Sequence, residues 1–179
     1  ENPKPDLVHQ EINKCSTNLD AFLSNSFHAG AALTCLVLGK AYAVLDDAQT
    51  AESHLYRGLE LLEQDAVSLV KNELRIELID LVLFSGDASK KGYATDLLRS
   101  AENELLDSGW HMLRVSLLYA RYYWQAGHKE TAFKYMVYCL KISEEESFEP
   151  WMEKQKKWVI PIMFELYAMN SFTSYINIL

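Results

Sequence analysis

Apolar residues recur every three or four positions along almost the whole chain, which is the period of one face of an α-helix. The first such segment runs through Leu7, Val8, Ile12, Cys15, Leu19, Phe22 and Leu23. The same period holds at residues 29–45, 48–62, 67–84, 94–106, 112–124, 131–142 and 151–169. No stretch alternates apolar and polar residues as a half-buried strand would. The pattern therefore predicts an all-α chain of about eight or nine helices.

Short breaks of turn-forming residues separate these segments. They are Asp46-Asp47, Ser85-Gly86-Asp87, Asp107-Ser108-Gly109 and Ala126-Gly127-His128. Among the prolines, only Pro161 falls well inside an apolar-periodic segment. Proline lacks the N–H that continues a helix, so we expect a kink or a helix start near Trp158.

One order of residues recurs in the chain. It reads Leu38-Gly39, Tyr42, Asp47, Ala51 and Leu55, and it returns without a gap as Tyr119-Ala120, Tyr123, His128, Ala132 and Met136. A looser copy between them, with three extra residues after Gly86, contains Ala94 and Leu98. Internal recurrence of this kind is typical of stacked helical hairpins.

Gly39 is the unusual member of this pattern. A glycine inside a helix costs up to about 1 kcal/mol relative to alanine. We expect closer packing to offset that cost, with Gly39 facing Ala51 on the second helix of the same hairpin. On this interpretation Gly39→Leu is destabilising, whereas Gly39→Ala is mild or even stabilising.

The recurring order resembles the tetratricopeptide (TPR) repeat, with L-G-x-x-Y followed by A-x-x-x-F and with Leu or Met in place of Phe. It departs from that repeat at Cys35, Arg75 and Ser116, where the family has tryptophan, and it lacks the closing proline. The resemblance implies a right-handed solenoid of antiparallel helix hairpins (a TPR-like α-α superhelix). We expect a single repeat domain over 1–179, with repeats at about 30–64, 67–107 and 110–146 and capping helices at 5–25 and 148–179.

The C-terminal part of the chain suggests a subfamily. Trp158, Pro161 and Met163, followed by Tyr175 and Ile176, are similar to the close of the repeat region in MalT-like bacterial regulators of the LuxR type. These regulators are large signal-transduction ATPases that control transcription. Their repeat arrays serve as sensors and as platforms for self-association. The resemblance implies that this chain is a fragment of such a regulator, with the ATPase and DNA-binding modules elsewhere.

Charge and cysteine content narrow the function classes. The 179 residues carry a formal net charge of −8, which argues against direct nucleic-acid contact by this segment. No apolar run approaches the roughly 20 residues that span a membrane. Cys15, Cys35 and Cys139 each fall on an apolar helical stripe, which predicts buried free thiols and a cytoplasmic protein.

Catalytic and metal-binding motifs have little support. The chain contains no phosphate-cradling G-x-x-x-x-G-K-[ST] loop. Its histidines, at positions 9, 28, 54, 111 and 128, have neither H-E-x-x-H spacing nor cysteine partners. The carboxylates of residues 144–146 are interpreted as a solvated surface. We therefore expect no enzyme activity, no cofactor and no metal.

The TPR resemblance also implies which residues line a concave groove. Carried onto this register, they are Leu33, Leu36, Lys40, Ala43 and Val44, then Glu73, Ile76, Asp80, Leu83 and Phe84, then Arg114, Leu117, Arg121, Trp124 and Gln125. From this set we take Arg114, Arg121, Trp124, Gln125, Lys40 and Asp80 as candidate ligand-binding residues. Arginine supplies paired donors and tryptophan a stacking plane.

A structural alternative exists for the two arginines, namely an ion-pair network with Glu73 and Asp80. The neighbouring tyrosines, Tyr119 and Tyr123, occupy repeat packing positions, and we expect them in the core.

The predicted function is a sensor or scaffold domain of a multidomain bacterial transcriptional regulator. It would bind a small-molecule effector or a protein segment in its groove. We expect the site between the second and third repeats, where Arg114 and Arg121 would supply charge and Trp124 an apolar wall for a polar ligand or an acidic peptide. The alternative is a free-standing TPR adaptor that holds a peptide of a partner protein. The sequence that flanks this segment in the gene would separate the two.

Overall fold

The computed structural model describes residues 5–63, 69–85, 88–104 and 108–168, and every regular element among them is helical. The elements are α1 (Pro5–Ser24), α2 (His28–Val44), α3 (Ala48–Leu61), α4 (Leu69–Phe84), the 3₁₀ helix η1 (Ala88–Lys90), α5 (Lys91–Glu104), α6 (Gly109–Gln125), α7 (Lys129–Glu145), α8 (Glu149–Lys154) and α9 (Lys156–Ala168). The all-α prediction is confirmed for these residues. The right-handed solenoid stays a prediction.

The chain divides into two compact units, Glu1–Ala101 and Glu102–Leu179, and the boundary falls within α5. The α2–α3 and α6–α7 pairs match the first and third predicted repeats to within a few residues. The single repeat domain stays a prediction.

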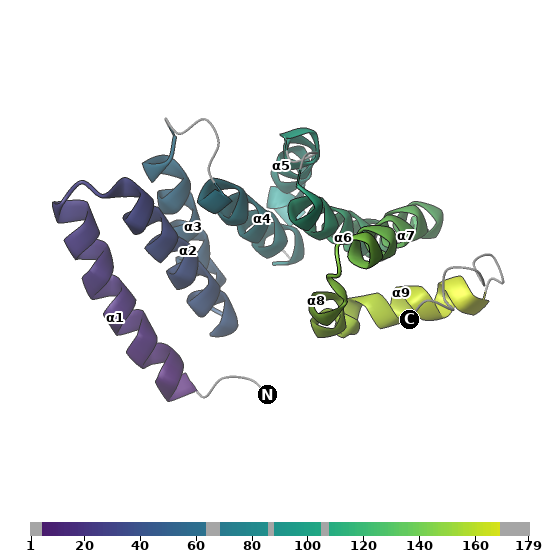
Figure 1. Ribbon diagram of the computed structural model, residues 1–179, viewed down its shortest axis with the longest axis horizontal. Coiled ribbons are helices and arrows are strands. Elements are labelled where there is room, and N and C mark those ends of the chain that lie inside the picture. The colour runs from purple at the N-terminus through teal and green to yellow at the C-terminus, as the bar shows by residue number, and fades with distance from the viewer. Residues whose placement is uncertain (1–4, 64–68, 86–87, 105–107, 169–179) are drawn as a thin grey trace. The chain divides into compact units, whose positions relative to one another are not determined.

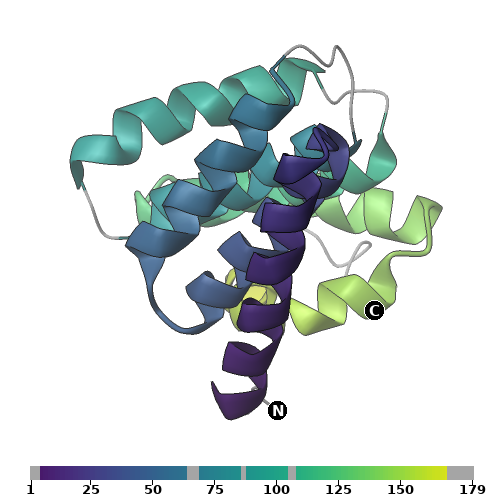
Figure 2. The ribbon, with the colours of Figure 1, turned by 90° about the vertical axis from the view of Figure 1, so that its left-hand side faces the viewer.

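In the first unit, α1 packs on α2, and α2 packs on both α3 and α4 (Figure 1). Figure 2 shows α1 in purple alongside the blue helices that follow it. The α1–α2 core is built from Ile12, Leu19, Ala31, Cys35 and Leu38. The apolar stripes that the sequence predicts on these helices therefore pack against each other.

Two glycines allow α2, α3 and α4 to approach closely. A Cβ on Gly39 would lie 2.7 Å from both Cγ and Cδ2 of Leu55 and 3.3 Å from the carbonyl oxygen of Ala51. A Cβ on Gly58 would lie 2.7 Å from Leu74 Cδ2 and 3.1 Å from Cys35 Cβ. Gly39 thus faces the second helix of its own hairpin, as predicted. A methyl group on Gly39 requires the Leu55 side chain to shift, which argues against the expected tolerance of Gly39→Ala.

Four helix connections share one turn. Ser26, Asp46, Gly127 and Ser147 each have positive φ. In each case the N–H of the next residue donates to the carbonyl five positions back; the pairs are Phe27 to Phe22, Asp47 to Tyr42, His128 to Tyr123 and Phe148 to Ser143, at 2.8 to 3.0 Å. This pattern is that of a Schellman helix terminus. It ends each helix and lets the next one begin four residues later.

The α2–α3 and α6–α7 hairpins also match in detail. Tyr42 stacks on His54 with ring centroids 5.4 Å apart, and Tyr123 stacks on Tyr135 at 5.8 Å. These two pairs occupy corresponding positions in the predicted repeats. The buried Ala120 stands where the first hairpin has Gly39. The recurrence seen in the sequence therefore reflects a recurring packing unit.

In the second unit, α6 packs on α7, which also packs on α8 and α9, while α8 packs on α9. The core includes Leu113, Met136, Cys139, Ile162 and Leu166. The Cys139 thiol donates to the carbonyl of Leu113, with 3.6 Å between sulfur and oxygen. Tyr119 is buried, as expected of a repeat packing position.

The remaining sequence predictions have mixed outcomes. Helix α9 begins at Lys156, two residues before Trp158, and Pro161 lies inside it. Ala94 and Leu98 of the looser copy are buried. Cys35 and Cys139 are buried free thiols, but Cys15 is only half-buried. The predicted motif around Tyr175 and Ile176 lies outside the described residues.

Candidate functional site

A pocket of about 390 Å³ opens in the first unit, where the last turns of α2 and α4 meet the start of α3. Its lining residues are Gly39, Lys40, Ala43, Asp46, Ala48, Leu55, Glu77, Asp80, Leu81, Phe84 and Ser85. The pocket exists because the lining residues of α2 and α3 include small side chains, and Leu55, Leu81 and Phe84 supply apolar contact area. The volume lies in the range of ligand sites, which is roughly 300–1,000 Å³.

Charged side chains surround this pocket. Lys40 Nζ lies 3.0 Å from Glu77 Oε1, and this ion pair joins α2 to α4. The lysine side chain is 50% exposed, so solvent weakens the pair. Asp46 and Asp80 add two further carboxylates to the lining. The pocket therefore combines an apolar wall with carboxylates and a single ammonium group.

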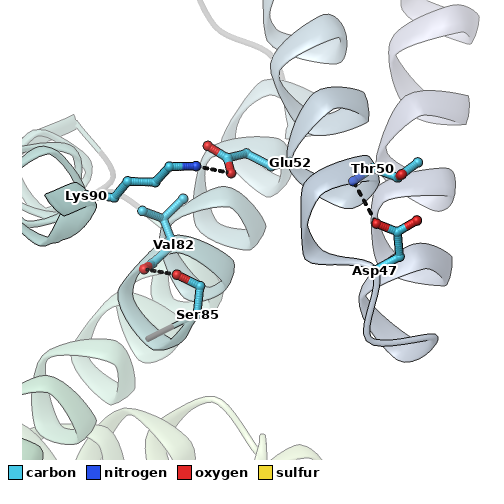
Figure 3. A network of polar contacts seen from close by, with 6 residues as sticks. All are labelled: Asp47, Thr50, Glu52, Val82, Ser85 and Lys90. Carbon is cyan, nitrogen blue, oxygen red and sulfur yellow. Dashed lines mark hydrogen bonds and ion pairs between the residues drawn. The ribbon is translucent and has the colours of Figure 1, made fainter. Parts of the chain in front are cut away.

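The segments that carry the lining are held by local polar contacts (Figure 3). Asp47 Oδ1 accepts from the N–H of Thr50 at 3.1 Å, which caps the first turn of α3 beside Asp46. Lys90 Nζ donates to Glu52 Oε2 at 2.5 Å and ties η1 to α3. The Ser85 hydroxyl donates to the carbonyl of Val82 at 3.1 Å. These contacts tie residues next to the pocket lining to one another within and between α3, α4 and η1.

An apolar stripe on α2 leads to the pocket. Leu33, Val37 and Val44 are 50%, 44% and 56% exposed. Their spacing of four and seven residues places them on one helix face. Lys40, which lines the pocket, lies between Val37 and Val44 on that face. We call Leu33, Val37 and Val44 the α2 stripe.

The structure brings together part of the predicted groove. Lys40, Ala43, Asp80 and Phe84 all line the pocket. In contrast, Leu36, Ile76 and Leu83 are buried and belong to the core rather than to a ligand surface. The register carried over from the TPR resemblance thus places α2 and α4 side by side, but some of its groove positions are used in packing.

The other four candidate residues lie in the second unit. The Arg114 guanidinium carbon lies 5.8 Å from the centroid of the Trp110 ring, and that of Arg121 lies 4.2 Å from the centroid of Trp158. Arg121 is only 7% exposed, so its guanidinium packs α6 against α9. This contact favours a structural role for Arg121. The ligand-binding role of the two arginines stays a prediction.

Trp124 and Gln125 lie at the C-terminal end of α6. The Trp124 ring packs against Phe133, with centroids 6.0 Å apart, and Lys129 Nζ lies 5.5 Å from the Trp124 ring centroid. Lys129 also pairs with Glu165 of α9 at 2.5 Å. Trp124 therefore joins α6 to α7, and the exposed Gln125 follows it at the helix end.

Three tyrosines of the second unit form a stack beside Glu102. Tyr119 and Tyr135 have ring centroids 4.5 Å apart, and Tyr123 stacks on both. The Tyr135 hydroxyl donates to Glu102 Oε1 at 3.5 Å. Desolvation and the nearby Glu102 carboxylate raise the pKa of Tyr135 to about 12. The Tyr135 hydroxyl therefore remains protonated at neutral pH, which suits a packing role.

Sequence reasoning missed Asp46, Glu77 and the exposed Val37. The sequence assigns Asp46 to a helix stop, whereas the structure gives it a positive φ and places it in the pocket lining. Glu77 stands three residues before Asp80 on α4, a spacing that places both on one helix face. That spacing was a usable signal.

Across residues 5–63, 69–85, 88–104 and 108–168, no three histidine, cysteine or carboxylate side chains are grouped to hold a metal ion. In the same ranges no helix is both long enough and apolar enough to cross a lipid bilayer.

Compared with known proteins, the chain matches no family model, no curated protein and no solved structure. The TPR and MalT-like resemblances therefore stay predictions.

Proposed function

We propose that this chain is a TPR-like sensor or scaffold region of a multidomain bacterial transcriptional regulator, and that it binds an effector or a protein segment in the groove between α2 and α4. One observation carries the proposal. The pocket at the ends of these helices is lined by four residues, Lys40, Ala43, Asp80 and Phe84, that the TPR resemblance assigns to a ligand groove.

The chemistry of the lining suits binding. Its carboxylates and its ammonium group can orient a polar ligand, and Leu81 and Phe84 offer apolar contact. The Ser85 hydroxyl is engaged with the Val82 carbonyl, and the pocket lining holds neither histidine nor cysteine that would activate it. Recognition accounts for these residues better than catalysis does.

The alternative function, a free-standing adaptor that binds a partner's peptide, uses the same groove. The α2 stripe favours a protein segment over a small molecule at this site, because exposed apolar residues beside a pocket give a longer ligand additional contact area. The sequence flanking this segment separates regulator from adaptor. A P-loop or a helix-turn-helix in the same gene supports the regulator.

A blocking substitution tests the groove. Ala43 is exposed and lines the pocket, so Ala43→Phe fills it without changing charge. Ala21→Phe, on the exposed side of α1, is the matched control. Displayed random peptides and a metabolite panel are the probes. We expect binders that Ala43→Phe abolishes and Ala21→Phe leaves intact. Binders indifferent to Ala43→Phe but lost in Arg114→Ala would move the site to the second unit.

A further inference from the structure

Helix α9 carries apolar residues on two faces. One face belongs to the core of the second unit, where α9 packs against α7 and α8. The other face carries three large apolar side chains that are half or more exposed, namely Ile160 (50%), Phe164 (74%) and Tyr167 (62%). Because these residues lie close together on one helix, they form a contiguous apolar patch, which marks an interaction surface.

The spacing along this outer face is that of a helix–helix seam. Lys157, which is also exposed, precedes the three apolar residues. The four positions 157, 160, 164 and 167 are separated by three, four and three residues. This alternation keeps side chains on one line toward a partner helix. We call Lys157, Ile160, Phe164 and Tyr167 the α9 seam, and the partner that fits it is another helix.

The α9 seam is symmetric about the position of Ile162. Ile160 and Phe164 lie two residues to either side of that position, and Lys157 and Tyr167 lie five residues to either side. In an antiparallel pair of α9 helices with a two-fold axis at this level, each Ile160 meets Phe164 of the other copy, and each Lys157 meets Tyr167 of the other copy. The first contact buries apolar groups, and the second places a cation against an aromatic ring. The seam therefore complements a second copy of itself.

The charges at the ends of α9 favour the same arrangement. Lys156 and Lys157 stand in the first turn of α9, which has no acidic residue, and the last turn of α9 has no basic residue. Cations are unfavourable at the N-terminus of a helix and favourable at its C-terminus. An antiparallel pair brings the two lysines of each copy beside the last turn of the other α9. A parallel pair would instead bring four lysines together.

We propose that the α9 seam is a self-association surface through which two copies of this chain pair with their α9 helices antiparallel. The inference is independent of the groove between α2 and α4, which belongs to the first unit. One face of a helix of 13 residues is smaller than the roughly 800 Å² per partner of a standard interface. The dimer is therefore weak, and we expect a dissociation constant between about 10 μM and 1 mM.

Analytical ultracentrifugation of the full chain at rising concentration tests the surface. Phe164→Glu should raise the dissociation constant of the dimer roughly 10-fold or more, because it places a carboxylate in the middle of the seam. Leu69→Glu is the matched control, since it introduces the same charge at an apolar residue of α4 that is 67% exposed. It should leave the dissociation constant unchanged. Circular dichroism confirms that each variant is folded.

A charge reversal tests the contribution of the lysines. Lys156→Glu combined with Lys157→Glu should weaken the dimer, because it places carboxylates beside the C-terminal end of the other α9. The control, Lys91→Glu with Lys134→Glu, makes the same change of net charge at exposed lysines of α5 and α7. If both double variants weaken the dimer equally, net charge alone is responsible and the antiparallel contact is overturned.

Disulfide trapping tests the register. Lys157→Cys and Tyr167→Cys chains, both carrying Cys15→Ser to remove the half-buried thiol, are mixed and oxidised. The antiparallel pair predicts the mixed 157–167 disulfide. Each cysteine would lie about 15 Å along the helix axis from its own counterpart, too far for a disulfide. An excess of the two homodimers would overturn the antiparallel arrangement.

Two results would overturn the self-association itself. One is a wild-type chain that stays monomeric up to about 1 mM, which would mean that something other than a second copy covers the seam. The other is a dimer that Phe164→Glu and Leu69→Glu affect equally, which would place the interface elsewhere on the chain.

Discussion

Gly39 lies directly against Leu55, and a methyl group at position 39 would sit 2.7 Å from Leu55 Cγ. The contact joins α2 to α3 at the edge of the pocket that both residues line. The glycine therefore sets the distance between the two helices and, with it, the shape of the candidate site.

Substitution at Gly39 should destabilise the chain in proportion to size. We expect Gly39→Ala to lower the free energy of unfolding by about 1–3 kcal/mol and Gly39→Leu by more, because Leu55 and the Ala51 carbonyl leave little room. Gly92 is the matched control, since nothing lies within 4 Å of a Cβ there. Gly92→Ala should raise stability by up to about 1 kcal/mol. Urea denaturation measures the free energy of unfolding of all three variants. A Gly39→Ala variant as stable as the wild type would contradict the observed contact.

The shared turns give a pair of opposite predictions. Ser147 has a φ of 59° and Gly127 a φ of 79° at corresponding positions of the Schellman termini. Ser147→Gly should stabilise by up to about 1 kcal/mol, because glycine adopts this conformation without steric cost. Gly127→Ala should destabilise by about 1 kcal/mol for the same reason. Thermal melts compare the Tm of the two variants with that of the wild type. Changes in Tm of the same sign for both variants would contradict the turn geometry.

Thiol reactivity should separate the cysteines. Burial raises the pKa of the Cys35 and Cys139 thiols, and both are inaccessible, whereas Cys15 is half-buried on α1. We expect the disulfide reagent DTNB to label one thiol promptly in the folded chain and the other two only after unfolding. Cys15→Ser should remove the prompt phase. Rapid labelling of all three would mean that the cores of both units are open.

The cap of α3 should make stability depend on pH. Hydrogen bonds from the Thr50 hydroxyl and from the Thr50 backbone N–H hold the pKa of Asp47 below its ordinary value of 3.8. A lowered folded-state pKa contributes stability above the ordinary value, and that contribution is lost as pH falls through the folded value. In Asp47→Asn the side-chain oxygen can still accept the hydrogen bond that caps α3, but the side chain does not titrate in the acidic range.

We therefore expect the Tm difference between wild type and Asp47→Asn to be largest near about pH 7 and to shrink toward about pH 3. Asp20→Asn, on the exposed face of α1, controls for loss of a charge. A difference that stays constant across this range would show that the Asp47 carboxylate does not cap α3.

Much of the local structure followed from residue patterns. Helical spacing predicted the elements, and the order of residues shared by the segments around Gly39 and Ala120 predicted two matching hairpins. Such patterns are local, because each depends on residues that lie within one or two helices of one another.

The candidate site was harder to predict, since it depends on which faces of distant helices meet. The register of α2 and α4 placed Lys40 and Asp80 together, but it did not show that Ile76 is buried or that Arg121 packs on Trp158. A polar side chain on a helix face looks the same in sequence whether it meets solvent, a ligand or an aromatic ring.

The groove between α2 and α4 is the central claim, and backbone NMR tests it most directly. Uniformly labelled chain is titrated with a peptide recovered from the display selection, and amide shifts are mapped onto the sequence. We predict that the largest shifts fall at Lys40, Ala43, Asp46, Asp80 and Phe84, which line the pocket, and along the α2 stripe. Shifts that leave these residues unchanged and gather instead between Arg114 and Gln125 would contradict the assignment.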